Sequence, residues 1–318
     1  MKNDFFERLF NFSPHAIVGE YPLNIKEYLN DMKTLVDGTL ERYIPSINSY
    51  PPDIFNSIRY SLFAGGKRLR PILVMASAKT IGSKREEVLP FACAIEMIHT
   101  YTLIHDDLPA LDNDDFRRGK PTNHKEFGEA IAILTGDALL TMAFEIMSDT
   151  RSMPHINPLL ILRAINEVAR GVGPSGTIGG QVVDIESTGK EVDIPTLEYI
   201  HTHKTGEMIL AAVRGGAILS NCQEDELNAL TRYGENIGLA FQIIDDILDV
   251  EGESEMMGKT SGSDERMKKV TYPSIFGIAE SKKIASRLID NSIKSLEMFG
   301  ERAEVLKDIS EYIIARRF

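Results

Sequence analysis

Two clusters of aspartates, both set in apolar sequence of helical periodicity, constrain this chain more than any other feature. The first runs from His105 to Asp112 with the sequence HDDLPALD, and the second runs from Gln242 to Asp249 with the sequence QIIDDILD. Either cluster alone could be a solvated run of charge, but carboxylates in apolar flanks are costly to bury unless a cation pairs with them. Two such clusters facing one cavity can hold several Mg²⁺ ions, which also take phosphate oxygens as ligands. The pair therefore predicts a site for cations and a diphosphate.

The spacing within the two clusters differs. Asp245 and Asp249 are four residues apart, so they share one face of a helix, and Gln242 joins that face from three residues before Asp245. Asp106 and Asp112 are six residues apart, and a straight helix would place them on different faces. The first cluster therefore cannot converge on one ligand as a regular helix.

Pro109 explains how the first cluster can still converge. A proline inside a helix removes one N–H donor and clashes with the carbonyl four residues earlier, here that of His105. We therefore expect the helix to end or kink at Asp106-Asp107, and an irregular turn to bring Asp112 back beside Asp106.

Composition excludes several classes of protein. The chain has 318 residues, a formal net charge of −12 and 43% hydrophobic residues, which is ordinary for a globular protein with a large core. Such a charge repels nucleic acid and anionic membranes, and would also repel a diphosphate unless local cations attract it. No uninterrupted apolar run approaches the ~20 residues of a membrane span.

The cellular location is predicted from the N-terminus and the cysteines. Residues 1–20 carry scattered charge without a long apolar core, so they do not form a signal peptide. The two cysteines, Cys93 and Cys222, provide no disulfide framework, although they could in principle pair. These features predict a cytoplasmic protein.

The periodicity of apolar residues predicts an all-α fold. Strand signals are scarce, and breaks fall at glycine clusters, at 65–66, 171–180 and 252–262. We expect a single large domain of roughly ten or more helices over residues 23–318, and a loosely attached arm over residues 1–22. Helical spacing is clearest over residues 54–63, 88–104, 130–147, 159–171, 197–219, 224–250 and 271–299.

Other segments carry groups that suit an anion. The sequence from Gly65 to Pro71, GGKRLRP, places three cations on a glycine turn at a helix start, where backbone N–H groups and arginines bind phosphate. His99 lies two helical turns before Asp106 and could equally be an ordinary core histidine. The polar segment 251–269, which includes Lys259, Lys268 and Lys269, could close over phosphate or be a solvated loop.

Two further breaks involve glycine. Lys204-Thr205-Gly206 interrupts a long helical stretch, and such a break could direct a lysine and backbone carbonyls into a cavity, or be a tolerated kink. The sequence from Gly179 to Asp184, GGQVVD, repeats that arrangement with a carboxamide and a carboxylate.

These motifs, in this order, resemble those of the trans-isoprenyl diphosphate synthases. The resemblance runs from about Tyr28 to the C-terminus and is nearest to the bacterial farnesyl enzymes, with the geranylgeranyl enzymes close by. It rests on GGKRLRP, DD-x4-D followed by Arg117-Arg118, GGQ-x-x-D, KTG, Q-x-x-DD-x-x-D and GK-x-x-GSD. It implies the isoprenoid synthase fold, with helices around a central cavity, and a homodimer.

The resemblance also implies roles for individual residues. It implies condensation of isopentenyl diphosphate with an allylic diphosphate, dimethylallyl or geranyl, in the presence of three Mg²⁺ ions, with Mn²⁺ as a possible substitute. The implied metal ligands are Asp106, Asp112 and Asp245, supported by Asp107 and Asp249. The residues implied to neutralise the allylic diphosphate are Arg117, Lys204 and Lys259. Those implied to hold isopentenyl diphosphate are Lys67, Arg70, His99 and Arg118. Further implied substrate contacts are Thr205, Gln242, Lys269 and Phe241.

The length of the product is less constrained. Tyr101 is bulky enough to close the floor of a cavity that extends along the helix before Asp106, and the small Thr102 lies beside it. This pair and the two-residue insertion in the first cluster resemble bacterial farnesyl synthases, and the same insertion occurs in plant-type geranylgeranyl enzymes. We expect a C15 product and keep C20 as the alternative.

Three other readings compete with this one. Glu96-x-x-His99 and Glu198-x-x-His201 match the helical spacing of di-iron carboxylate bundles, but that reading leaves both aspartate clusters unexplained. A terpene cyclase would ionise a diphosphate but would not need a second diphosphate site. The basic residues Lys67, Arg70 and Arg118 therefore argue against this reading. A regulatory subunit should have lost aspartates that this chain keeps.

Overall fold

The structure is a computed structural model, and it describes residues 24–251 and 269–315. It confirms the predicted all-α class, because the only strands in these ranges are β1 (Phe116–Arg117) and β2 (Lys120–Pro121), which have two residues each and form one antiparallel hairpin. The α-helices are α2 (Ile25–Tyr43), α3 (Pro52–Leu62), α4 (Leu69–Ile81), α5 (Arg85–Asp106), α6 (Asn123–Phe127), α7 (Glu129–Ser148), α8 (Pro158–Val172), α9 (Thr177–Ser187), α10 (Ile194–Ile200), α11 (Glu207–Leu219), α12 (Glu224–Glu251), α15 (Tyr272–Phe276), α16 (Ile278–Ser295) and α17 (Glu304–Ala315). A π-helix, η1 (His201–Gly206), joins α10 to α11, and a 3₁₀ helix, η2 (Glu297–Ala303), precedes α17.

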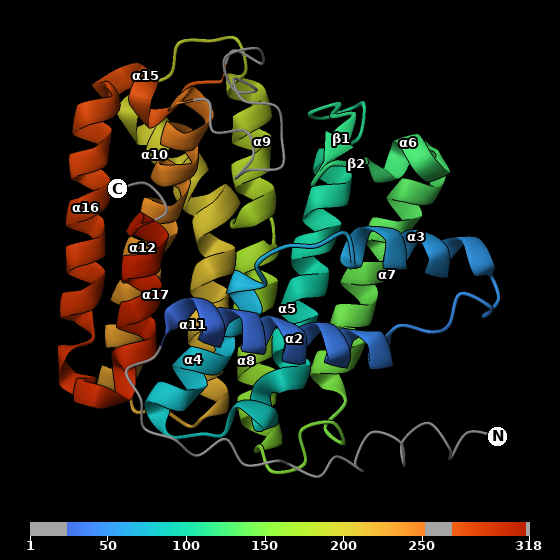
Figure 1. The fold of residues 1–318 in the computed structure, drawn as a ribbon, viewed down its shortest axis with the longest axis horizontal. Coiled ribbons are helices and arrows are strands. Elements are labelled where there is room, and N and C mark those ends of the chain that lie inside the picture. Colours follow the sequence, from blue (N-terminus) through green and yellow to red (C-terminus); the bar gives the residue numbers. More distant parts are fainter. Residues whose placement is uncertain (1–23, 252–268, 316–318) are drawn as a thin grey trace.

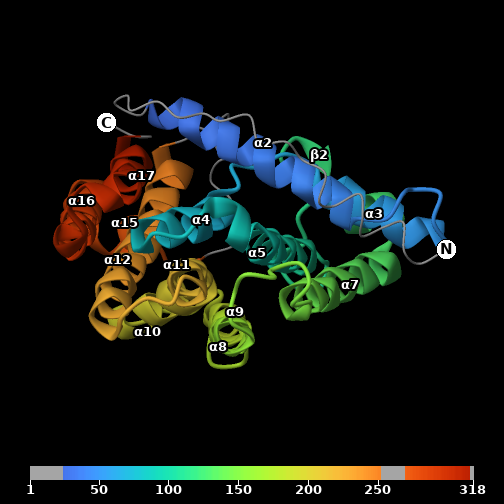
Figure 2. The ribbon, with the colours of Figure 1, turned by 90° about the horizontal axis from the view of Figure 1, so that it is seen from below.

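The long helices run side by side, and α2 and α3 cross them on one face (Figure 1). Seen from below, α4, α5 and α11 occupy the middle of the bundle, and α7, α8, α12 and α16 lie around them (Figure 2). Every residue from Val88 to Ile98 in α5 is buried, as is every residue from Pro71 to Ala78 in α4. A helix that is buried on all sides is expected to be apolar all round, which is why these two segments lack a polar face.

Two helices are apolar and long enough to cross a membrane by length and composition alone, α5 and α7. The apolar part of α5 is 78% buried, so its composition follows from its place in the core. That of α7 is 39% buried, which leaves part of its apolar surface exposed. Such a pair is weak evidence for a membrane protein, because a core helix passes the same test.

Several predicted segments differ from the structure in detail. Residues 197–219 form three pieces, α10, η1 and α11, instead of one interrupted helix. Residues 271–299 divide at Gly277, whose φ of 76° suits glycine and ends α15 before α16 begins. The glycine break at 65–66 lies between α3 and α4 as predicted. The break at 252–262 and the arm over residues 1–22 lie outside the described residues.

Arg68 links four helices at the start of α4. Its backbone is left-handed, with φ of 53°, and its side chain is buried. Its Nε donates to Asp37 of α2 at 2.7 Å, its Nη1 to Glu96 of α5 at 2.7 Å, and its Nη2 to the carbonyl of Leu62 in α3 at 2.6 Å. Of the three cations on the glycine turn, Arg68 is therefore paired within the protein, and it is not among the residues predicted to bind substrate. Glu96 is likewise held by an arginine instead of a metal, which contradicts the di-iron reading.

We predict that Arg68→Leu lowers the free energy of unfolding by about 3–5 kcal/mol, because it leaves the carboxylate of Glu96, which is 2% exposed, without its cation. The control is Arg151→Leu, since Arg151 pairs with Asp149 on the surface and such pairs contribute about 0–1 kcal/mol. Urea denaturation of both variants measures the difference. Equal small losses would show that Arg68 is not the link between these helices.

Candidate functional site

The first aspartate cluster lies on a turn that folds back on the end of α5. The helix ends at Asp106, as the position of Pro109 predicts, and the amide of Asp112 donates a hydrogen bond of 2.9 Å to the carbonyl of Asp106. The irregular turn predicted from the six-residue spacing is therefore confirmed. It places Asp106 and Asp112 at the same end of α5.

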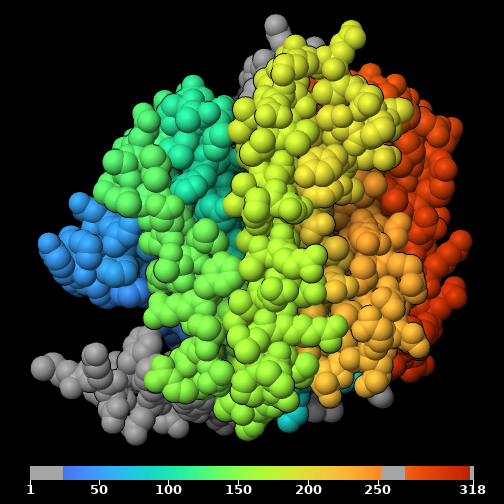
Figure 3. Space-filling model, turned by 180° about the vertical axis from the view of Figure 1, so that it is seen from behind, coloured from blue at the N-terminus to red at the C-terminus, as the bar shows by residue number. Residues whose placement is uncertain are grey.

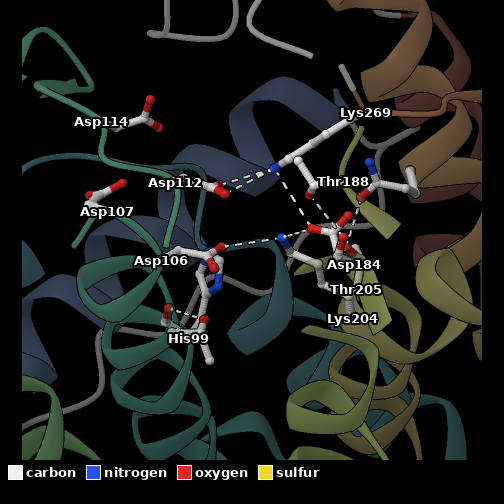
Figure 4. Close-up of polar contacts among 12 residues, drawn as sticks. His99, Asp106, Asp107, Asp112, Asp114, Asp184, Thr188, Lys204, Thr205 and Lys269 are labelled. Carbon is white, nitrogen blue, oxygen red and sulfur yellow. Dashed lines mark hydrogen bonds and ion pairs between the residues drawn. The ribbon is translucent and has the colours of Figure 1, made fainter. Parts of the chain in front are cut away.

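Asp107 points away from this pair and toward the hairpin. Arg117 of β1 donates from Nε to both oxygens of Asp107, at 2.8 and 2.7 Å, and its Nη2 lies 3.8 Å from Asp114. Asp107 is buried, and the carboxylates of Asp107 and Asp106 outweigh the effect of burial and raise the pKa of Arg117. Figure 4 shows Asp107 and Asp114 apart from Asp106 and Asp112. Arg117 thus positions the turn by holding its second aspartate.

Two lysines lie among the remaining carboxylates (Figure 4). Lys204 Nζ is 2.7 Å from Asp184 Oδ2 of α9 and 3.8 Å from Asp106 Oδ2. Lys269 Nζ is 3.1 and 3.2 Å from the two oxygens of Asp112 and 3.7 Å from Asp184 Oδ2. Burial alone would lower the pKa of Lys204, but Asp106 and Asp184 outweigh it and raise that pKa. Three carboxylates therefore share two ammonium groups.

The donor atoms of this arrangement are of the kind that binds Mg²⁺. The groups are carboxylate oxygens, which Mg²⁺ prefers, and they already accommodate two positive charges. Among the described residues, no three side chains of the metal-binding types converge closely enough to hold an ion by themselves. Phosphate oxygens and waters would have to complete the coordination, as they usually do for Mg²⁺.

The second cluster lies on α12, where Asp245 is partly buried and both Asp246 and Asp249 are buried. The amide of Gln242 contacts Asp246, with Nε2 donating to Oδ1 at 2.9 Å. Asp246 Oδ2 accepts from the backbone N–H of Tyr272 at 3.1 Å. Burial raises the pKa of Asp246 to about 7, against the opposing effect of these two hydrogen bonds. Sequence reasoning grouped Gln242 with Asp245 and Asp249 and missed Asp246, although the spacing of four was available as a signal.

The predicted break at Lys204-Thr205-Gly206 forms the last three residues of the π-helix η1. Short π-helical segments between α-helices are frequent at functional sites. Thr205 Oγ1 donates to Gln242 Oε1 at 2.8 Å. A Cβ on Gly180 of α9 would lie 2.2 Å from the backbone nitrogen of Lys204, so only glycine permits this approach. The glycine pair of the GGQVVD motif therefore serves packing, and its aspartate, Asp184, reaches the two lysines. Sequence analysis noted Asp184 without assigning it to the site.

A basic cluster lies next to the acidic one. Arg70 Nη1 is 3.4 Å from His99 Nε2, and Arg118 donates to the carbonyl of Gly65. Burial lowers the pKa of both arginines, and burial together with Arg70 and Arg118 holds the pKa of His99 well below its usual value. Arg70 Nε is buried and has no hydrogen-bond partner among the described residues. This cluster would be stabilised by an anion, and Lys67 is exposed on the adjoining turn.

Of the remaining predicted residues, the two assigned to product length lie on α5. Tyr101 is 8% exposed, and its ring meets that of His105 edge-on at 5.3 Å. Its pKa is raised by burial, by Asp106 and by Asp137, so it lies near α7, about one turn from the first cluster. Thr102 Oγ1 donates to the carbonyl of His99 at 2.8 Å. Lys259 lies outside the described residues.

Comparison with known proteins gives the family. The family model described as Polyprenyl synthetase matches residues 51–313. The chain is 49% identical to a geranylgeranyl diphosphate synthase of Cyanophora paradoxa (92% of this chain, 97% of the relative) and 44% identical to a farnesyl diphosphate synthase of Geobacillus stearothermophilus (92% and 98%). An FPP/GFPP synthase of Zymomonas mobilis has a similar structure, with a TM-score of 0.82 and 36% identity over 92% of this chain and 99% of that one.

The chain therefore belongs to the polyprenyl synthetase family, and it is a trans-prenyltransferase of isoprenoid biosynthesis. Relatives of similar identity carry names for C15 and C20 products, so the family alone does not give the length of the product.

Proposed function

We propose that this protein condenses isopentenyl diphosphate with dimethylallyl and geranyl diphosphates to give farnesyl diphosphate, in a Mg²⁺-dependent reaction. The observation that carries the proposal is that two sites of opposite character adjoin each other. Lysines and carboxylates form one site at the end of α5, and Arg70, His99 and Arg118 form the other. A geranylgeranyl product is the second candidate, because a relative with that name is 49% identical.

The acidic site would take the allylic diphosphate. Asp106, Asp112 and Asp245 would hold Mg²⁺, which when bound supplies the charge that neutralises the diphosphate as it leaves. Lys204 lies beside Asp106 and Lys269 beside Asp112, and both lysines would donate to the same phosphate oxygens. The role proposed for Lys259 is the same and rests on its sequence motif.

The basic cluster would hold isopentenyl diphosphate. Arg70 and Arg118 would form charge-assisted hydrogen bonds to its phosphates, and neutral His99 would donate one more. The C–O bond of the allylic substrate breaks, and the double bond of isopentenyl diphosphate then forms a C–C bond to the allylic cation. The proton lost from the new chain goes to the departed diphosphate, since no described side chain is placed as an obvious base.

The proposal predicts the behaviour of three aspartate variants. Asp106→Ala and Asp245→Ala should each reduce kcat by at least ~10³, equivalent to about 4 kcal/mol of transition-state stabilisation, while Asp225→Ala on the exposed start of α12 should have no effect. The assay is incubation with labelled isopentenyl diphosphate and each allylic primer, followed by chromatography. EDTA should abolish turnover, and Mg²⁺ or Mn²⁺ should restore it. Full turnover in excess chelator, or an unfolded Asp106→Ala by circular dichroism, contradicts the mechanism.

The C15 assignment rests on Tyr101. Tyr101→Ala should open space along α5 and α7 and give products of C20 or longer, because apolar walls gain about 25 cal/mol per Å² of apolar surface buried. Thr102→Phe should shorten the product toward C10 by overpacking. Tyr50→Ala is the matched control, since Tyr50 is 92% exposed. An unchanged product in Tyr101→Ala would place the floor of the cavity elsewhere.

We also propose that the protein acts in the cytoplasm as a homodimer. Exposed apolar side chains gather on two neighbouring helices, Ile133 and Leu134 on α7 and Leu159 and Leu162 on α8. Figure 3 shows these two helices at the surface, on the face seen from behind. A second copy of the chain would bury this surface and explain why α7 is apolar beyond the needs of the core.

Light scattering should give the mass of two chains for the wild type. Leu134→Arg should give monomers, because it places a charge in the proposed interface. Met298→Arg is the control, since Met298 is 52% exposed on η2, far along the chain from α7. A monomeric wild type would overturn the proposal.

A further inference from the structure

A chain of four side chains connects η1 to α12. Thr205 Oγ1 donates to Gln242 Oε1 at 2.8 Å, and Gln242 Nε2 donates to Asp246 Oδ1 at 2.9 Å. Asp246 Oδ2 lies 3.4 Å from His201 Nε2 and accepts from the N–H of Tyr272 at 3.1 Å. Asp246 is 2% exposed and His201 is 5% exposed, so both are shielded from bulk solvent.

The contact with Asp246 holds the Gln242 amide in one orientation. Both carboxylate oxygens of Asp246 accept hydrogen bonds, Oδ2 from the N–H of Tyr272 and Oδ1 from the NH₂ of Gln242. Turning the amide over would place its oxygen against Asp246 Oδ1 and would leave buried polar groups unsatisfied. The acceptor Oε1 is therefore held toward Thr205, whose hydroxyl proton is already given to it.

This orientation determines which atoms line the adjoining cavity. Thr205, Gln242 and Lys204 line a cavity of about 80 Å³ between η1, α12 and Lys269. With the amide held as described, the Gln242 atom next to Thr205 in this lining is the oxygen Oε1 and not the NH₂. Oxygen dipoles fixed before the reaction stabilise a positive charge that develops beside them, and an N–H group in the same place would oppose it.

We propose that Asp246 and His201 are positioning residues that fix the Gln242 amide so that its oxygen faces the allylic cation. The inference rests on the proposed prenyl transfer. His201 stacks on the ring of Tyr272, with centroids 5.3 Å apart and an interplanar angle of 19°. It begins the same six-residue helix that carries Thr205, so η1 holds both ends of the chain of contacts.

The test reverses the amide and then restores it. In Asp246→Asn, the new carboxamide must turn its oxygen toward the N–H of Tyr272 and its NH₂ toward Gln242, which forces the Gln242 oxygen away from Thr205. We expect kcat to fall about 10- to 100-fold, and KM for isopentenyl diphosphate to change less than about twofold. The control Glu235→Gln removes one charge from the exposed face of α12 and should have no effect.

The double variant Asp246→Asn with Gln242→Glu exchanges the two groups. The glutamate accepts from both the new asparagine and Thr205, at unchanged net charge, so kcat should recover to within about fivefold of the wild type. A double variant no better than the single one overturns the proposal, and so does an unaffected Asp246→Asn. If Asp246→Asn does not fold, His201→Phe replaces it, since it keeps the stacking on Tyr272 and should lower kcat about three- to tenfold. An unchanged kcat in that variant also overturns the proposal.

A binding measurement provides a readout besides turnover. The probes are an allylic diphosphate analogue with an ammonium nitrogen at the carbon that becomes cationic, and its neutral isostere. The wild type should prefer the ammonium compound by calorimetry, and Asp246→Asn should reduce that preference about tenfold. An equal preference in both proteins contradicts the inference. A wild type without prenyl transfer would instead refute the proposed function.

Discussion

Lysine ammonium groups make it possible for three carboxylates to lie together at the end of α5. Each ammonium is supplied by a different part of the chain, Lys204 by η1 and Lys269 by the residues before α15, and Asp184 of α9 contacts both. A chain of net charge −12 could not otherwise keep these groups close without large repulsion. The acidic turn, α9, η1 and the residues before α15 therefore meet in one cluster of charges. The same cluster is prepared for further cations, since three carboxylates still exceed two ammonium groups.

The turn before α4 carries arginines that are buried, and their positive charges must be compensated. Arg68 is satisfied within the protein by Asp37 and Glu96, and these carboxylates outweigh the effect of burial and raise its pKa. Arg70, two residues later, is not compensated to the same extent, and its pKa is lowered. One short motif thus supplies an arginine that fixes the helices and another whose charge is available to an anion. The left-handed backbone at Arg68 turns the chain just before α4 begins, so the side chains of Arg68 and Arg70 point in different directions.

Sequence alone predicted the helical class, the end of α5 and the two aspartate clusters, because these follow from periodicity, from Pro109 and from the cost of buried charge. It predicted neither the pairing of Asp107 with Arg117 nor that of Asp246 with His201. Both are contacts between elements, and no local pattern shows which neighbour a side chain will meet. The π-helix was missed for a related reason. Its backbone packs against Gly180 at Lys204, and a glycine in the sequence does not reveal which backbone will approach it.

Adjacent aspartates on α12 face different neighbours, and this explains why the second cluster needs a doublet. Successive residues of a helix are about 100° apart, so Asp245 and Asp246 cannot serve the same ligand equally. Asp246 is directed to His201 and Gln242, whereas the charge of Asp245 opposes the lowering of the pKa of Arg70. One helix therefore carries a group directed to the η1 side of the cavity and a charge that acts on the basic cluster. In the proposed reaction one substrate binds at each site, so a rigid helix that carries groups for both would fix their separation more accurately than two loops could.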